Sequence, residues 1–353
     1  MPESPDSLLP KLGITTGDPA GIGPEVSLRA SVNPEFQGRC RLLLFGDSGI
    51  LTDEAGRLGI ADRFTPVSLE SVHGGGALPE RGIVHVPAKR EAITAGRGSA
   101  ASGDAAARNI LECARACGAG LLSAMVTAPL NKKYLQAAGY PYPGHTEFLA
   151  QIAGASRVAM AFLTERLKVV LATTHIPLCA VAAAITTDLL LEKLAILIEE
   201  FPRLGLPCRR VAVAGLNPHA GEEGLLGRDE LERITPALDA ARRLFPDIAI
   251  AGPLPADTLF YRAAQGEFDA VLALYHDQGL GPVKLLGFGE AVNVTLGLPF
   301  LRTSVDHGTA FEIAGKACAR PESMISAIRW ALRLKRGGGI RPVAAPAIEP
   351  RIR

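Results

Sequence analysis

The sequence predicts an α/β fold of two domains, in which helices cover the faces of largely parallel sheets. The chain has 353 residues, 48% of them hydrophobic, which is enough for a large core. Short β-branched apolar runs alternate with longer Ala- and Leu-rich segments of helical period. Five of the apolar runs end in polar turns that contain Gly or Pro, as the strands of parallel sheets do.

Each of these five runs predicts a buried strand followed by a turn that faces a ligand. In open α/β sheets the ligand crevice lies outside the carboxyl ends of the strands, so we expect the turns to line one site. In chain order, the strands and their turns are residues 12–15 with 16–25, 121–126 with 127–133, 169–172 with 173–177, 211–214 with 217–222, and 270–274 with 275–279.

Composition argues against several classes of protein. The net charge is +1, from 37 basic and 36 acidic residues, so no nucleic-acid partner is expected. The six cysteines are scattered without a C-x-x-C pair, which favours a reducing compartment and hence the cytoplasm. Residues 1–11 lack the pattern of a signal peptide. The uncharged stretch 169–187 contains His175 and Pro177, and it indicates a strand, a loop and a helix rather than a membrane span.

Three of the seven histidines, His175, His219 and His276, follow the ends of predicted strands. One such histidine alone is more often structural, but three at equivalent positions favour a shared metal. Imidazoles suit zinc or another late first-row divalent ion better than magnesium, and three ligands leave a position open for catalysis. Asp277 and Asp257 are candidates to orient the imidazoles, although Asp257 is equally compatible with a helix N-cap.

Basic and polar residues in two other segments are candidates for binding an anion. Thr146 or His145 begins a helical pattern and could bind a phosphate there, although the local pattern alone favours a plain N-cap. Lys284, Asn293 and Arg302 occur in a stretch otherwise rich in Gly and Leu, where basic groups more often have an anionic partner. No strand is followed by G-x-G-x-x-G and no G-K-[ST] is present, so neither an ordinary Rossmann site nor a P-loop is supported.

Several long motifs, in a fixed order, resemble the signature segments of the 4-hydroxythreonine-4-phosphate dehydrogenase family. They span most of the chain, from about residue 11 to about residue 335. The motifs are T-G-D-P-A-G-I-G-P-E (16–25), P-G-H-T-E (143–147), N-P-H-A-G-E (217–222), G-P-L-P-A-D-T (252–258), Y-H-D-Q-G (275–279) and R-T-S-V-D-H-G-T-A (302–310). Residues 21–25 and 307–316 are also similar to the isocitrate and isopropylmalate dehydrogenases.

The resemblance implies a two-domain α/β/α subunit of the isocitrate and isopropylmalate dehydrogenase type, with a cleft between the domains. The first domain would be built from both chain ends, residues 1–140 and 296–353. The second, residues 141–295, would carry the metal ligands and a dimer interface. A homodimer with its site at the subunit interface is implied, and NAD would be bound by loops particular to this superfamily.

The resemblance also implies a role for individual residues. The metal ligands would be His175, His219 and His276, holding zinc or, alternatively, cobalt, manganese or magnesium. The substrate-binding residues would be His145, Thr146, Lys284, Asn293 and Arg302. The cofactor-binding residues would be Gly17, Asp18, His307 and Glu312. A carboxylate at Glu312 would accept the ribose hydroxyls and repel a 2′-phosphate, which predicts NAD over NADP.

The activity implied is NAD-dependent oxidation of 4-phosphohydroxy-L-threonine, in the biosynthesis of pyridoxal phosphate. The metal would activate the C3 hydroxyl and NAD would take the hydride. The resulting β-keto acid would decarboxylate to 3-amino-2-oxopropyl phosphate. Either Lys284 or Asp257 would accept the proton, and the sequence does not decide between them.

Other functions remain open at this point. The nearest is a paralogous dehydrogenase for threonate or erythronate 4-phosphate, or for an aromatic cis-dihydrodiol. A non-catalytic protein that binds a metal or a phosphorylated metabolite is a second alternative. Such a protein would lack some of the candidate metal-, substrate- and cofactor-binding residues. A metal-dependent hydrolase would not need the Glu312 segment and would not reduce NAD.

Overall fold

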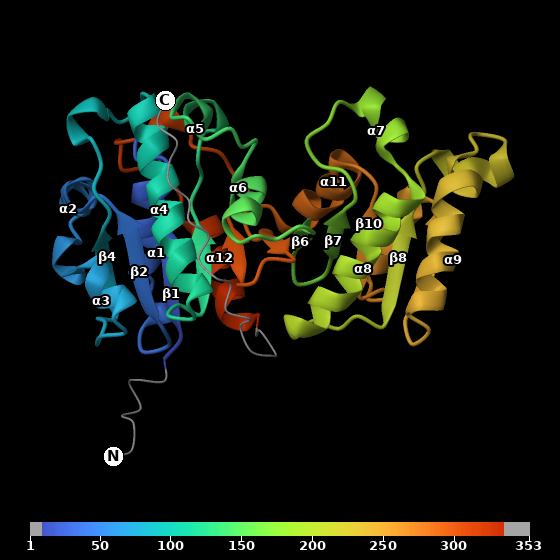
Figure 1. The fold of residues 1–353 in the computed structure, drawn as a ribbon, viewed down its shortest axis with the longest axis horizontal. Coiled ribbons are helices and arrows are strands. Elements are labelled where there is room, and N and C mark those ends of the chain that lie inside the picture. Colours follow the sequence, from blue (N-terminus) through green and yellow to red (C-terminus); the bar gives the residue numbers. More distant parts are fainter. Residues whose placement is uncertain (1–8, 335–353) are drawn as a thin grey trace, which may run out of the picture. The chain divides into compact units, whose positions relative to one another are not determined.

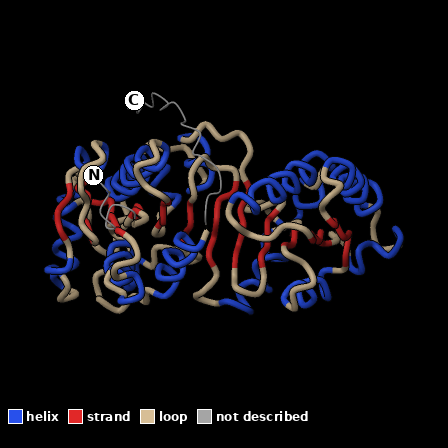
Figure 2. Tube along the Cα trace, turned by 90° about the horizontal axis from the view of Figure 1, so that it is seen from below, coloured by secondary structure: helices blue, strands red, loops and turns tan. Residues whose placement is uncertain are grey.

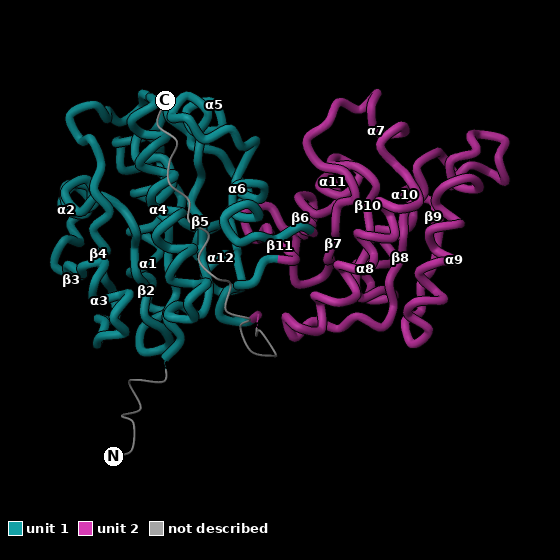
Figure 3. Tube along the Cα trace, viewed as in Figure 1, with its two compact units in different colours: residues 1–156, 298–333, 339–353 teal, residues 157–297, 334–338 magenta. Residues whose placement is uncertain are grey.

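Strands and helices alternate along residues 9–334, the part of the chain that this computed structural model describes (Figure 1). The chain divides into two units (Figure 3). Within the described residues, unit 1 comprises 9–156 and 298–333, and unit 2 comprises 157–297 with Leu334. The α/β fold predicted from the alternation of apolar runs and helical segments is confirmed.

The strands of unit 1 are all parallel and lie in the order β3-β4-β2-β1-β5-β12. Their bounds are β1 (Lys11–Thr15), β2 (Arg41–Gly46), β3 (Thr65–Val67), β4 (Arg81–His85), β5 (Ala124–Thr127) and β12 (Arg302–Ser304). The central strands are buried almost throughout, because helices lie on both faces of the sheet (Figure 2).

The helices of unit 1 are amphipathic segments that pack their apolar sides on this sheet. The α-helices are α1 (Gly23–Ser31), α2 (Ser48–Arg57), α3 (Leu69–His73), α4 (Ala100–Gly118), α5 (Lys132–Ala137), α6 (His145–Ile152) and α12 (Glu322–Arg333). Short 3₁₀ turns are η2 (Pro34–Phe36), η3 (Ala61–Arg63), η4 (Arg90–Ala92) and η7 (Phe311–Ile313). The α4 helix packs closely on β1, since a Cβ at Gly13 would lie 2.4 Å from the Sγ of Cys113. Cys113 and Cys117 are buried and free, as expected of core residues.

The strands of unit 2 lie in the order β11-β6-β7-β10-β8-β9. Their bounds are β6 (Ala159–Leu163), β7 (Lys168–Leu171), β8 (Arg210–Ala214), β9 (Ala249–Leu254), β10 (Ala270–Ala273) and β11 (Val292–Leu296). β6 runs antiparallel to both of its neighbours, whereas β7, β10, β8 and β9 are parallel. The carboxyl ends of β7, β10 and β8 therefore lie side by side.

The helical segments of unit 2 are α7 (Leu178–Ala184), α8 (Thr187–Arg203), η5 (Pro218–Gly224), η6 (Glu230–Ile234), α9 (Thr235–Leu244), α10 (Ala256–Ala264) and α11 (His276–Gly287). The core on one face of the sheet includes Phe162, Leu171, Leu259, Val271 and Val283. None of the helices in residues 9–334 has the length and apolar character that crossing a membrane requires.

The observed division differs from the predicted one over residues 141–156, which the structure groups with unit 1. Aromatic packing agrees with this grouping, because the ring of Phe148 packs against Tyr140 at 5.5 Å between centroids. The hydroxyl of Tyr140 also donates a hydrogen bond to Asp104 on α4. Parts of the predicted first domain, residues 1–8 and 335–353, lie outside the described residues.

Candidate active site

A buried arginine marks the candidate anion site of unit 1. Arg302 is the first residue of β12, and its side chain is 1% exposed. Its Nε and Nη2 donate to the hydroxyl of Thr127 on the neighbouring strand β5, at 3.1 and 2.7 Å. Burial lowers the pKa of Arg302 to about 9, opposed by the nearby charge of Glu147. The guanidinium is therefore still charged at neutral pH, and a buried cation favours an anionic partner.

The first turn of α6 contributes a second buried polar group. Nε2 of His145 is buried and has no hydrogen-bond partner within residues 9–334. Burial, followed by the positive charges of Arg302 and Lys132, holds the pKa of His145 well below its usual value. The imidazole is therefore neutral at pH 7, and its Nε2 is available to a ligand. Thr146 follows it in the chain and is also buried.

Some of the contacting residues in unit 1 were predicted from the sequence, and others were not. His145, Thr146 and Arg302 were predicted, and the charge of Arg302 acts on His145. Thr127 and Lys132 were not singled out, although both lie in the turn that follows the predicted strand 121–126. The role of Thr127 depends on the pairing of β5 with β12, which are far apart in sequence, and that of Lys132 depends on its proximity to His145.

In unit 2 the structure brings together two of the three predicted metal ligands. The rings of His175, after β7, and His276, after β10, have their centroids 5.7 Å apart. Nδ1 of His276 lies 2.7 Å from an oxygen of Asp277. His219 follows β8, and its side chain is exposed. Among residues 9–334, no three His, Cys, Asp or Glu side chains are close enough together to hold a metal ion.

The backbone that carries His219 is left-handed. Residues 219–223 all have positive φ, with values of 52°, 54°, 83°, 44° and 53°, and only Gly221 among them is a glycine. A left-handed conformation costs about 1–2 kcal/mol for each L-residue that has a side chain. Such strain persists only where the surrounding structure holds the segment in place. The sequence of this turn, with one glycine in five residues, gives no local signal for a left-handed conformation.

The remaining candidates of unit 2 are dispersed over three elements. Asn293 is on β11, and its Oδ1 is buried without a hydrogen-bond partner in the described part of the chain. Lys284 is half-buried on α11. Asp257 is exposed in the first turn of α10, whose N-cap is Pro255. The alternative interpretation of Asp257 as the N-cap is therefore wrong.

The predicted cofactor residues of unit 1 differ in exposure. Gly17 has φ of +67°, and a Cβ there would lie 2.1 Å from the carbonyl oxygen of Pro129, so only glycine fits this turn. Asp18 is buried and accepts from the backbone N–H of Ala20 at 2.9 Å; burial raises its pKa, although that bond and one from Ser102 lower it. Glu312, in η7, is exposed.

Another cofactor candidate, His307, shares with His145 a buried Nε2 that has no hydrogen-bond partner in the described residues. Its Nδ1 lies 3.0 Å from the carbonyl oxygen of Gly308. An N–H on Nδ1 can donate to that carbonyl, which leaves Nε2 as an acceptor for a ligand.

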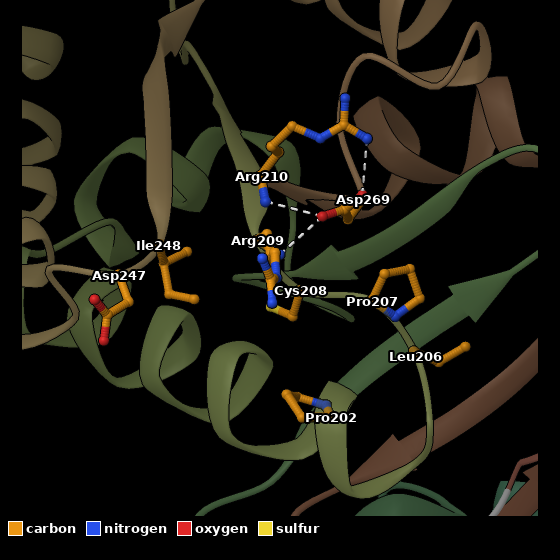
Figure 4. A pocket seen from close by; sticks show the side chains of 9 residues that line it. All are labelled: Pro202, Leu206, Pro207, Cys208, Arg209, Arg210, Asp247, Ile248 and Asp269. Atoms are coloured by element: carbon orange, nitrogen blue, oxygen red, sulfur yellow. Dashed lines mark hydrogen bonds and ion pairs between the residues drawn. The ribbon is translucent and has the colours of Figure 1, made fainter.

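The opposite edge of the unit 2 sheet has a pocket of about 820 Å³ (Figure 4). It lies at the amino ends of the strands, where Arg210 begins β8 and Asp269 precedes β10. The carboxylate of Asp269 accepts the backbone N–H groups of Arg209 and Arg210, at 2.8 and 2.9 Å. None of the predicted site residues lines this pocket.

A model of the family described as "Pyridoxal phosphate biosynthetic protein PdxA" matches residues 38–331. The chain belongs to the PdxA family. Membership of this family was predicted from the order of the motifs, and it is confirmed.

Similarity to PdxA-family proteins extends over nearly the whole chain. A 4-hydroxythreonine-4-phosphate dehydrogenase of Desulfosudis oleivorans is 44% identical over 339 residues, which are 95% of this chain and 99% of that one. A D-threonate 4-phosphate dehydrogenase of Cupriavidus necator is 42% identical over 336 residues, with coverage of 92% and 97%. A crystal structure of 4-hydroxythreonine-4-phosphate dehydrogenase from Klebsiella pneumoniae matches with a TM-score of 0.84 at 37% identity, covering 94% of this chain and 99% of that one.

Proposed function

We propose that this chain is an NAD-dependent dehydrogenase that oxidises 4-phosphohydroxy-L-threonine for the biosynthesis of pyridoxal phosphate. The β-keto acid formed would decarboxylate to 3-amino-2-oxopropyl phosphate. The observation that carries the proposal is the buried, charged Arg302 close to a neutral His145 with an unpartnered Nε2. This arrangement fits an anionic group of a small substrate, and relatives of similar length bear the name of this activity.

Binding of the substrate phosphate is assigned to unit 1. The guanidinium of Arg302 supplies a fixed positive charge, and a neutral His145 can donate one N–H from Nε2 to a phosphate oxygen. The backbone N–H groups at the start of α6, beside Thr146, favour the same negative charge. Asn293 and Lys284 are assigned to the rest of the substrate.

A divalent metal is assigned to His175, His219 and His276, with zinc favoured and cobalt, manganese or magnesium as alternatives. Imidazoles are suitable donors, and the contact of Asp277 with Nδ1 of His276 leaves Nε2 for an ion. The His219 side chain is exposed, so no packed position holds its imidazole in place. A metal bound there would act as a Lewis acid on the substrate hydroxyl.

The proton from the C3 hydroxyl is assigned to Lys284 or Asp257. Asp257 is exposed to solvent, whereas Lys284 is half-buried. NAD is assigned to the segment of Gly17, Asp18, His307 and Glu312. The exposed carboxylate of Glu312 would accept ribose hydroxyls and repel a 2′-phosphate.

We further propose a cytoplasmic homodimer with its site at the subunit interface. Leu285 and Phe288, at the end of α11, are 87% and 84% exposed, and they lie in the chain just after the His276 segment. Large apolar side chains gathered on one element are typical of a surface that another subunit covers. The six cysteines are all free, which agrees with a reducing compartment.

The test is NADH formation, followed by absorbance, with purified protein, NAD, a divalent metal and 4-phosphohydroxy-L-threonine. Threonate and erythronate 4-phosphates run in parallel, because the D-threonate relative makes this second function the nearest alternative. We expect turnover of the amino-acid phosphate and its loss with a chelator. Turnover of a sugar-acid phosphate alone would reassign the substrate, and no reduction with any of them would contradict the dehydrogenase.

The preference for NAD is tested in the same assay with Glu312→Gln. Removing the carboxylate charge should raise kcat/KM for NADP by about tenfold, since one lost like-charge contact is worth about 1.4 kcal/mol. Glu322→Gln, on the exposed start of α12, is the control and should leave the ratio of NAD to NADP unchanged. A wild-type chain that prefers NADP would contradict the assignment of Glu312.

A further inference from the structure

Buried hydrogen bonds connect the segment before His175 to the segment before His276. Thr173, which follows β7, is 7% exposed. Its hydroxyl donates to the carbonyl oxygen of Leu274 at 2.7 Å, and its backbone N–H donates to the same oxygen at 3.2 Å. The end of β7 is thereby fixed to the end of β10.

A glutamine extends the connection to the segment before His219. Gln278 lies in the first turn of α11, two residues after His276, and is 9% exposed. Its Oε1 accepts the backbone N–H of Leu274 at 2.7 Å, and its Nε2 donates to the carbonyl oxygen of Gly215 at 2.8 Å. One side chain therefore holds the end of β10 and the end of β8 in register.

A buried carboxylate completes the series at the turn that carries His219. Glu230 is 3% exposed, and its Oε1 accepts the backbone N–H groups of Leu216 and Asn217 at 2.8 and 2.7 Å. Its Oε2 accepts from the side-chain amide of Asn217 at 2.9 Å. A Cβ at Gly221 would lie 2.6 Å from this Oε2, so the carboxylate also packs against the left-handed turn.

We propose that Thr173, Gln278 and Glu230 are positioning residues, which together fix the three strand ends that carry His175, His276 and His219. The role in metal binding rests on the proposed function. The connection between the three strand ends rests on the hydrogen bonds alone. The left-handed turn makes the role of Glu230 specific. A strained segment with an exposed histidine keeps its conformation only if the surrounding structure holds it. Glu230 accepts hydrogen bonds from the start of the turn and packs against its middle at Gly221.

The same strand supplies a matched control at its other end. Asp269 accepts the backbone N–H groups of Arg209 and Arg210 at the amino end of β8, as Glu230 accepts those of Leu216 and Asn217 at the carboxyl end. Glu230→Gln and Asp269→Asn therefore remove the same kind of bond from one strand. Only the first change lies near a histidine.

The experiment is hydrogen–deuterium exchange on the full chain, compared for the wild type, Glu230→Gln and Asp269→Asn. An amide cannot accept all three N–H groups at position 230, so exchange in residues 215–226 should rise by about tenfold or more. If the bonds act as one network, exchange in residues 274–278 should rise as well. Asp269→Asn should raise exchange around residues 209–210 and leave residues 215–226 unchanged.

Zinc binding to the same three proteins, measured by calorimetry with the metal alone, gives an independent result. Loss of a residue that supports metal ligands weakens affinity by about 10- to 100-fold, so Glu230→Gln should bind zinc that much more weakly and Asp269→Asn should match the wild type. Gln278→Met, which keeps the shape but removes both bonds, should repeat the effect of Glu230→Gln.

Two results would overturn the inference. One is exchange in Glu230→Gln that rises only at Leu216 and Asn217, with residues 219–226 and 274–278 unchanged. The other is an equal loss of zinc affinity in Glu230→Gln and Asp269→Asn, which would show a general effect on stability. A wild-type chain that binds no zinc would instead contradict the proposed metal, and the exchange data would still decide the inference.

Discussion

The two units hold their candidate residues in different ways. In unit 1, Arg302 and the Nε2 of His145 are buried, and burial shifts the pKa values of both side chains. In unit 2, His175 and His219 are exposed on turns, and the backbone beneath them is held by buried hydrogen bonds. The candidate anion site therefore consists of desolvated side chains, whereas the exposed candidate metal ligands depend on how precisely the backbone beneath them is held.

This difference has an energetic consequence. A buried cation such as Arg302 carries a desolvation cost that an anionic ligand offsets. Its burial therefore lowers the stability of the free protein but favours the binding of an anion. The histidines of unit 2 carry little such cost, but the left-handed residues 219–223 carry strain in the backbone instead. Substitutions in the two units should therefore change different measured quantities.

The largest effect is expected from a histidine of unit 2. His276→Ala should lower kcat by more than about 100-fold, because even residues that only support a metal ligand contribute 10- to 100-fold. The circular-dichroism spectrum and the melting temperature should remain close to those of the wild type, since the side chain is not in the core. His73→Ala, which changes an exposed histidine of unit 1, is the control. Near-normal turnover in His276→Ala or His219→Ala would remove the metal proposal.

A smaller effect on activity, without a loss of stability, is expected in unit 1. Arg302→Met should raise KM for the phosphorylated substrate by at least about 30-fold, since removing one partner of a buried charge pair costs about 2 kcal/mol or more. The melting temperature without ligand should stay the same or rise, and stabilisation by inorganic phosphate should be lost.

The control for that change is Arg329→Met, which removes an arginine from a surface pair with Glu35. It should leave KM unchanged. A large fall in the melting temperature of Arg302→Met, with KM unaltered, would show that Arg302 is structural and would break the contrast between the units.

The smallest effect concerns pH. The pKa of His145 in the folded chain lies well below the ordinary value of about 6.5, so the unfolded chain binds a proton first as the pH falls. Below about pH 6.5 this residue should therefore reduce the free energy of unfolding by up to roughly 1.4 kcal/mol per pH unit. Urea titrations of His145→Gln should show a shallower loss from pH 6.5 to 5. Equal slopes in the two proteins would contradict the burial of the imidazole.

Much of the fold could be predicted because parallel strands leave a clear pattern in the chain. The five apolar runs became β1, β5, β7, β8 and β10, and the turns after them carry most of the candidate residues. The strand-end argument also selected His175 and His276, which lie side by side. The motif order then gave the family, which no single strand could have given.

The rest depended on contacts that local sequence does not contain. Thr127 is a partner of Arg302 only because β12 pairs with β5, although the two residues are 175 positions apart. The left-handed turn at His219 contains one glycine in five residues, so local propensity gives no sign of it. Glu230, whose carboxylate accepts the backbone N–H groups at the start of this turn, was not among the candidate residues predicted from the sequence.

The split composition of unit 1 has a consequence for synthesis on the ribosome. Residues 157–297, which make up nearly all of unit 2, emerge before β12 and α12 of unit 1 exist. Domains fold as units while the chain emerges. Unit 2 can therefore complete its sheet while the sheet of unit 1 still lacks β12. Arg302 is on that strand, so the candidate anion site can form only after residues 157–297 have been synthesised.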